Sequence, residues 1–226
     1  MLSAIIVAAG SSQRMGFDKL LALLADKPVL ARTIDAFEQT ASVEEIILVA
    51  RAERLGEFEN LVTENAFTKV RHVIPGGKQR HDSVRAGLER ISADATFVAV
   101  HDAARPLVMP EQIERVLALA RTHGGAALAE PITSTLKRAD ESHVVTGGVE
   151  RENLYAMQTP QIFARDLLER AYAAVAAGKL SVTDEVSAVE HLGEKVLIVT
   201  NDDWNVKITY PRDLLLAQAA IARRST

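Results

Sequence analysis

The sequence predicts an α/β fold in which a mainly parallel, twisted β-sheet carries helices on both faces. Three observations support this prediction. Short runs rich in Val, Ile and Ala recur along the chain without regular polar alternation, which is typical of strands buried on both faces. Segments with the spacing of amphipathic helices lie between these runs. The chain has 226 residues, 48% of them hydrophobic, which is enough to bury a core around such a sheet.

Six apolar runs are expected to form the strands. They are AIIVAA at 4–9, EIILVA at 45–50, VRHVI at 70–74, TFVAVHDA at 96–103, GAALAEPI at 125–132 and KVLIVT at 195–200. Because these runs alternate with helical segments, we expect a Rossmann-like sheet of mostly parallel strands. Ligands of open α/β sheets bind beyond the carboxyl ends of the strands, so a site is expected in the segments that follow the runs.

Four amphipathic segments are expected to form the helices that cover the sheet. They are residues 29–40, 80–91, 109–122 and 165–178. In the first segment, Val29, Ile34 and Phe37 fall on one apolar stripe. Pro110 suits the first turn of the third helix, and Gly178 is a helix stop.

The polar segment 135–161 interrupts this alternation and reads as a projecting β-hairpin. A two-stranded hairpin is only marginally stable by itself, so packing against another surface is expected. We therefore predict one domain over residues 1–226 that carries residues 135–158 as a β-arm, and a second subunit is one surface on which this arm could pack.

The composition excludes several classes of function. The chain has no cysteine, so disulfides, thiolate metal sites and a cysteine nucleophile are absent. The net charge of −4 does not favour binding to nucleic acid or to a membrane surface. No apolar run approaches the roughly 18 residues that a membrane span needs. A cytoplasmic protein that binds neither nucleic acid nor membrane is expected.

Two loops after expected strands carry cations at the start of a helix. In AAGSSQRMGFDKLL at 8–21, the cations Arg14 and Lys19 follow Gly10, so this loop could bind an anion. The Walker A and dinucleotide-binding glycine patterns are both absent. In PGGKQRHDSVRAGL at 75–88, a basic helix entry follows two glycines. Each loop alone is also consistent with a plain turn that carries solvated cations or ordinary helix caps.

Three other stretches are candidates for chemistry. In VAVHDAARP, Asp102 ends a strand, where one carboxylate and substrate phosphates can hold Mg²⁺, although Arg105 could instead neutralise it in a structural ion pair. In SVTDEVSAVE, Thr183 or a neighbour can cap a helix. In NVKITYPRDL, Lys207 reads by itself as a surface residue.

Together these stretches resemble the 2-C-methyl-D-erythritol 4-phosphate cytidylyltransferase family, which acts in the non-mevalonate isoprenoid pathway. The matching motifs, in order, are AAGSSQRMGFDKLL, PGGKQRHDSVRAGL, HDAARP, TLKRA, TPQ, TDEVSAVE and NVKIT, and they cover nearly the whole chain. The resemblance implies that CTP and methylerythritol phosphate give 4-diphosphocytidyl-2-C-methyl-D-erythritol and pyrophosphate, with Mg²⁺ as cofactor, by in-line attack on the α-phosphate.

The resemblance also implies residue roles. The implied catalytic residues are Arg14, Lys19 and Lys207, and the implied metal ligand is Asp102. The implied nucleotide-binding residues are Ala8, Ala9, Gly10, Gly77, Arg80, Ser83, Asp102 and Ala103. The implied contacts to the phosphorylated polyol are Arg105, Thr135, Arg151 and Thr183. Of these, Thr135 and Arg151 lie on the arm and are expected to reach the site of a partner subunit.

The chain departs from the family pattern at Lys78, where an acidic residue is common, and around Ser12 and Leu20 in the first loop. These changes keep the two cations of that loop. Two alternatives remain: a cytidylyltransferase for ribitol 5-phosphate or another polyol phosphate, and a non-catalytic nucleotide-binding module. A Rossmann dehydrogenase is disfavoured because the glycine fingerprint is missing.

Overall fold

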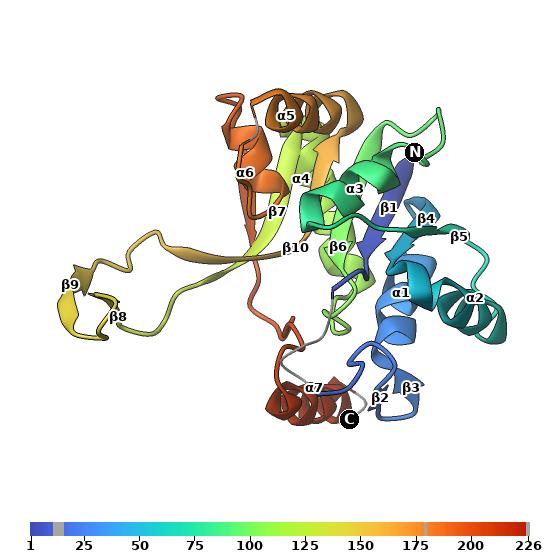
Figure 1. Cartoon of the computed structure of the whole chain (residues 1–226), viewed down its shortest axis with the longest axis horizontal. Coiled ribbons are helices and arrows are strands. Elements are labelled where there is room, and N and C mark those ends of the chain that lie inside the picture. Colours follow the sequence, from blue (N-terminus) through green and yellow to red (C-terminus); the bar gives the residue numbers. More distant parts are fainter. Residues whose placement is uncertain (11–15, 179, 225–226) are drawn as a thin grey trace.

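The computed structural model describes residues 1–10, 16–178 and 180–224, and among them seven strands form one sheet (Figure 1). In sheet order these strands are β11 (Leu197–Thr200), β7 (Gly125–Pro131), β10 (Tyr155–Ala164), β6 (Phe97–Asp102), β1 (Leu2–Val7), β4 (Val43–Ala50) and β5 (Val70–Pro75). Pairings are parallel except those of β10, which runs antiparallel to both β6 and β7. The mainly parallel α/β sheet is therefore confirmed.

Each of the six expected runs overlaps one of these strands, but the seventh strand, β10, was not expected. The sequence prediction placed 155–158 in the arm, whereas the structure places these residues in the sheet. The error has a physical cause, because β10 buries the polar side chains Gln158, Thr159 and Gln161 and so lacks the apolar pattern of the other strands. The arm is correspondingly shorter than the predicted 135–158.

Helices cover both faces of the sheet, as expected. One face carries α1 (Val29–Gln39), α2 (Leu55–Glu64), α4 (Pro110–His123) and α7 (Pro211–Arg224), and the other carries α3 (Arg80–Leu88), α5 (Arg165–Gly178) and α6 (Glu185–Glu190). Successive residues of a strand point into opposite cores. Ile6 belongs to the core under α1, α2, α4 and α7, and Ile5 belongs to the core under α3, α5 and α6. This two-sided burial explains the unbroken apolar runs in the sequence.

The expected helices at 29–40, 80–91, 109–122 and 165–178 correspond to α1, α3, α4 and α5. Helices α2 and α7, the short 3-10 helix η2 (Ala52–Arg54) and the small ribbon of β2 (Leu23–Leu24) and β3 (Lys27–Pro28) were not anticipated. Helix α3 packs tightly on the sheet, since a Cβ added at Gly87 would lie 2.7 Å from Ile5 Cγ2. This close packing fixes the helix whose first turn enters the site described below.

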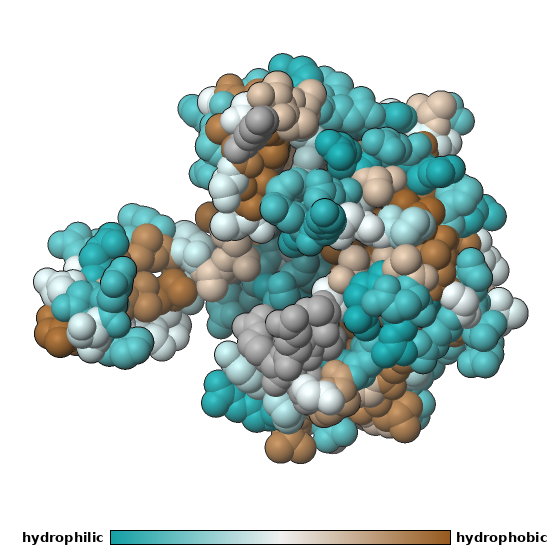
Figure 2. All heavy atoms as spheres, in the orientation of Figure 1, coloured by the Kyte–Doolittle hydropathy of each residue, from teal (hydrophilic) through white to brown (hydrophobic). Residues whose placement is uncertain are grey.

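A β-hairpin projects from the body of the domain, as the sequence predicts (Figures 1 and 2). Its strands are β8 (Leu136–Ala139) and β9 (Val145–Val149), which pair in antiparallel register. Val144 and Val145, at the turn into β9, are 60% and 62% exposed. The arm thus presents apolar surface away from the core of its own subunit. Among the described residues, no helix is long and apolar enough to span a membrane.

Candidate active site

A pocket of about 610 Å³ opens at the carboxyl ends of β1 and β6. Its lining residues are Val7, Ala8, Ala9, Gly10, Lys19, Leu20, Gly77, Lys78, Gln79, Arg80, Ser83, Asp102, Ala104, Lys207 and Thr209. Among the residues that the structure describes, the charged members of this lining are four cations and one carboxylate, that of Asp102. Such a concave, cationic surface of small backbone-rich segments is suited to a polyanionic ligand.

The first wall of the pocket is backbone at the ends of strands. Residues Ala8 to Gly10 continue β1, and the Ala8 N–H donates to the Val49 carbonyl at 2.7 Å. Opposite them, the double glycine approaches the first turn of α3 closely. A Cβ at Gly76 would lie 2.6 Å from Ser83 Oγ, and one at Gly77 would lie 2.2 Å from the Cβ of Asp82. The glycines are therefore required by packing, which keeps the helix entry close to the pocket.

Asp102 lies at the centre of a cluster of cations. Its Oδ1 accepts from Arg80 Nε at 3.2 Å, and its Oδ2 accepts from Lys207 Nζ at 2.6 Å and lies 3.9 Å from Arg105 Nε. Burial raises the pKa of this carboxyl, but the charges of Arg80, Lys207 and Arg105 outweigh burial and hold the pKa well below its ordinary value. Asp102 is therefore a carboxylate at any pH near neutrality.

Lys207 is brought to this carboxylate by a segment that is not part of the sheet. The Ile208 N–H donates to the Ala104 carbonyl at 2.8 Å, and Arg105 Nη1 donates to the Asn205 carbonyl at 2.8 Å. Lys19 Nζ donates to the Ile208 carbonyl at 2.7 Å from the other side. The segment around Lys207 is thus held through its own main-chain groups, which contact the Ala104 carbonyl and the side chains of Arg105 and Lys19.

The structure brings together most of the sequence-predicted site. The predicted residues that line the pocket are Ala8, Ala9, Gly10, Lys19, Gly77, Arg80, Ser83, Asp102 and Lys207. Ala103 is buried directly after Asp102, and Arg105 lines a neighbouring pocket of about 500 Å³. The ion pair of Arg105 with Asp102, considered from the sequence, is present together with two closer cations. Arg14 lies outside the described residues.

Besides Ala103 and Arg105, three other predicted residues do not line the pocket of their own chain. Thr183 is exposed just before α6, whose N-cap is Asp184, as the sequence suggested. Thr135 and Arg151 are exposed at the two ends of the arm, and Arg151 Nη1 donates to the Thr133 carbonyl. The pocket of a single chain therefore contains most of the predicted nucleotide-binding residues. It does not contain the arm residues that were expected to contact the phosphorylated polyol.

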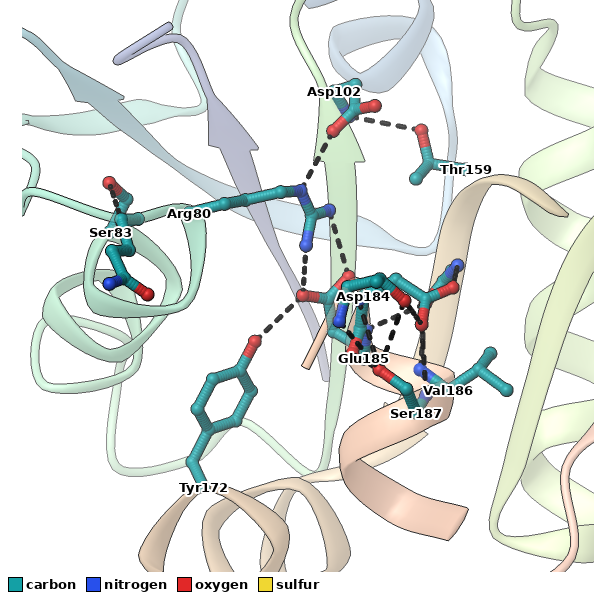
Figure 3. A network of polar contacts seen from close by, with 12 residues as sticks. Arg80, Ser83, Asp102, Thr159, Tyr172, Asp184, Glu185, Val186 and Ser187 are labelled. Atoms are coloured by element: carbon teal, nitrogen blue, oxygen red, sulfur yellow. Dashed lines mark hydrogen bonds and ion pairs between the residues drawn. The ribbon is translucent and has the colours of Figure 1, made fainter. Parts of the chain in front are cut away.

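The sequence prediction missed four residues that hold the site together. Thr159 Oγ1 accepts from the Asp102 N–H at 3.0 Å, and Gln161 Oε1 accepts from the N–H groups of Glu185 and Val186. Glu185 pairs with Arg80 from behind the pocket, and the Tyr172 hydroxyl donates to Glu185 (Figure 3). Only Thr159 and Gln161 left a signal, because polar residues inside an otherwise apolar run indicate buried hydrogen bonds.

The family model for 2-C-methyl-D-erythritol 4-phosphate cytidylyltransferase matches residues 2–223. Proteins of that name from Dehalococcoides mccartyi (strain CBDB1) and Desulforamulus reducens are 40% and 39% identical to this chain, and each match covers 98% of this chain and 96% of the relative.

Solved structures agree with these matches. The crystal structure of 4-diphosphocytidyl-2C-methyl-D-erythritol synthase from Anaerococcus prevotii superposes with a TM-score of 0.86 at 29% identity and covers 98% of this chain and 96% of its own. The Thermus thermophilus cytidylyltransferase gives a TM-score of 0.78 at 29% identity and covers 97% and 98%. With the family model matched over nearly the whole length, this chain belongs to the 2-C-methyl-D-erythritol 4-phosphate cytidylyltransferase family.

Proposed function

We propose that this nucleotidyltransferase joins CTP to 2-C-methyl-D-erythritol 4-phosphate in the pocket at the ends of β1 and β6, with release of pyrophosphate. The observation that carries the proposal is a pocket at the carboxyl ends of parallel strands whose described lining includes four cations and one ionised carboxylate. That arrangement suits a triphosphate. The family to which the chain belongs supplies the reaction.

The reaction needs positioning and charge stabilisation more than covalent chemistry. A phosphate oxygen of the acceptor attacks the α-phosphorus of CTP, a new P–O bond forms, and the bond to the β-phosphate oxygen breaks so that pyrophosphate leaves with the electron pair. Negative charge increases on the oxygens of the α-phosphate and of the leaving group. Lys207 and Lys19 line the pocket and are proposed to stabilise that charge. The acceptor phosphate is already ionised, so the attack needs no general base.

The nucleotide is proposed to lie against Ala8 to Gly10 and the turn at Gly77. Both walls are main chain with small side chains, and the Ser83 hydroxyl accepts from the Gly77 N–H at 3.2 Å. A wall of main chain and small side chains can reject a purine by size, and fixed N–H and hydroxyl groups can recognise the polar edge of cytosine.

Mg²⁺ is proposed as the cofactor, with Asp102 as its protein ligand. Among the described residues, no group of three or more acidic or histidine side chains could hold a metal. A single ionised carboxylate facing a phosphate pocket nevertheless fits Mg²⁺, because this ion commonly takes one or two protein carboxylates and completes its shell with phosphate and water. The bound ion would supply neutralisation of phosphate charge.

The arm is proposed to complete the acceptor half of a partner's site in a homodimer. Thr135 and Arg151, which the family resemblance assigns to the phosphorylated polyol, do not line the pocket of their own chain. The arm projects away from the body and exposes Val144 and Val145, which a partner would cover. An interface that exchanges an identical element is a common route to symmetric dimers.

Complementation between two inactive variants tests this sharing. Lys207→Ala damages a chain's own pocket, and Arg151→Ala damages the site that its arm completes. In a heterodimer of the two, one site loses both residues and the other is intact, so heterodimers purified through two affinity tags should recover about half of wild-type kcat per dimer. The kcat of each variant by itself, as a homodimer, is expected to remain near background. Heterodimers as inactive as the parents would contradict the shared arm.

The acceptor is tested by pyrophosphate release from CTP and Mg²⁺ with either methylerythritol phosphate or ribitol 5-phosphate. We expect the higher kcat/KM with methylerythritol phosphate. A preference for ribitol phosphate would favour the second acceptor class, which is expected to use the same CTP half of the site. The absence of pyrophosphate with every acceptor would favour a non-catalytic nucleotide-binding module.

A further inference from the structure

Behind the pocket lies a carboxylate that the proposed reaction does not use directly. Glu185 is completely buried at the first residue of α6 and does not line the pocket. Its Oε1 accepts from Arg80 Nη1 at 2.6 Å and from the Tyr172 hydroxyl at 2.8 Å, and its Oε2 accepts from Arg80 Nη2 at 3.0 Å (Figure 3). Glu185 therefore forms a two-pronged ion pair with one edge of the Arg80 guanidinium.

The Nε atom of the same guanidinium contacts the carboxylate that lines the pocket. Arg80 Nε donates to Asp102 Oδ1 at 3.2 Å, and Asp102 Oδ2 in turn pairs with Lys207 (Figure 3 shows the Arg80 link). Burial alone would lower the pKa of Arg80, but Glu185 and Asp102 together raise it above its ordinary value. A continuous line of contacts thus runs from Tyr172 through Glu185 and Arg80 to the reacting end of the pocket.

The position of Glu185 is itself fixed by the sheet. The N–H groups of Glu185 and Val186 donate to Gln161 Oε1 at 3.1 and 3.0 Å, and Gln161 Nε2 donates to Asp184 Oδ2 at 2.9 Å. Strand β10 therefore anchors the start of α6. A buried ion pair is weak evidence for added stability, because desolvation offsets most of the Coulombic gain, so a geometric role is the better reason for this arrangement.

We propose that Glu185, supported by Tyr172, is a positioning residue that holds the Arg80 guanidinium against Asp102 while a polyanionic nucleotide occupies the pocket. Without Glu185, the guanidinium would be drawn to the entering triphosphate and would release Asp102 Oδ1. The carboxylate, and Lys207 with it, would then lose the orientation needed for attack at the α-phosphorus. This inference rests on the proposed function and adds two residues to the machinery of the same site.

The inference predicts a change in kcat with little change in KM for CTP. Glu185→Gln keeps the shape of the side chain but removes the charge and places an amide donor against the guanidinium. We expect kcat to fall about 10- to 100-fold, the scale of a small displacement of reacting groups. KM for CTP should stay within about threefold, because Gly77 and Ser83 are joined by their own hydrogen bond and do not depend on Glu185.

A double variant tests whether Glu185 acts through Arg80. Arg80→Gln removes the group that Glu185 is proposed to hold, so adding Glu185→Gln to it should lower kcat by less than about twofold more. If the kcat of the double variant falls by the product of the two single-variant factors, the inference is contradicted. If Glu185→Gln does not fold, Tyr172→Phe removes one hydrogen bond to the same carboxylate and should lower kcat about two- to fivefold at unchanged KM; wild-type kcat in Tyr172→Phe would then count against the inference.

Glu45→Gln is the matched control. Glu45 is also a buried glutamate, but it lies at the amino end of the sheet, where it accepts from Ser3 and from the Ser92 N–H. The Glu45→Gln substitution should lower the melting temperature without changing kcat. Glu185→Gln with wild-type kcat and a lowered melting temperature would reduce Glu185 to a structural role. Wild-type protein that releases no pyrophosphate would contradict the proposed function, whereas active wild type beside a fully active Glu185→Gln contradicts only the positioning role.

Discussion

Replacing Lys207 by alanine should lower kcat by about 10²- to 10³-fold while the protein stays folded. The ammonium group lies in the pocket, 2.6 Å from Asp102 Oδ2, and its side chain is 43% exposed, so it is accessible to a phosphate. The segment that carries it is held by the Ile208 N–H and the Asn205 carbonyl rather than by the lysine itself. Truncation therefore removes charge stabilisation of the transition state without releasing the segment.

Steady-state kinetics at saturating CTP and acceptor measure this effect, and a thermal unfolding curve verifies the fold. Lys195→Ala is the matched control, because Lys195 is exposed and lies just before β11, outside the lining of the pocket. We expect the control to keep wild-type kcat. An equal loss in both variants, or wild-type turnover in Lys207→Ala, would exclude the proposed role of Lys207.

Local patterns in the sequence were enough for most of the sheet. Runs such as 45–50 are apolar on both faces because each face packs under helices, and that pattern is visible without a structure. Strand β10 could not be found in this way. Its Gln158, Thr159 and Gln161 are buried because their side chains form hydrogen bonds with groups from other segments: the Asn201 and Asp184 side chains and the Asp102 N–H. The pattern of β10 therefore depends on partners that a local reading of the sequence does not contain.

The site shows the same limit. Asp102 was identifiable because a carboxylate at the end of a buried strand has few structural uses. Lys207 looked like a surface residue, and only the family resemblance assigned it to catalysis; its contact with Asp102 spans 105 positions of the chain. The pairing of Arg80 with Glu185 spans the same separation and left no local signal, since a glutamate in the first turn of a helix is ordinary.

Asp102→Asn is expected to have a larger effect on catalysis than Lys207→Ala. The substitution keeps the shape of the side chain and the main-chain hydrogen bond to Thr159 Oγ1, but it removes the only carboxylate of the pocket lining that the structure describes. Arg80 and Lys207 lose their shared partner, and the proposed Mg²⁺ loses its protein ligand. We expect kcat to fall by about 10³-fold or more, and the Mg²⁺ concentration for half-maximal rate to rise.

The same variant should also be less stable, by about 1–3 kcal/mol at pH 7. Arg105 loses its ion pair with the Asp102 carboxylate, and Arg80 is left with Glu185. In the wild type the pKa of Asp102 is held below its ordinary value, so its contribution is fully present above about pH 5 and is lost only as the pH falls below the ordinary carboxyl range toward the lowered pKa.

Urea unfolding at pH 7 and at pH 5 tests this sign directly. The difference in free energy of unfolding between wild type and Asp102→Asn should be the same at both values, since Asp102 stays ionised throughout. Asp94→Asn, at an exposed aspartate in the turn before β6, should change neither stability nor kcat. A difference that disappears at pH 5 would mean that the three cations do not hold Asp102 in its charged form, and the single-carboxylate metal site proposed here would lose its basis.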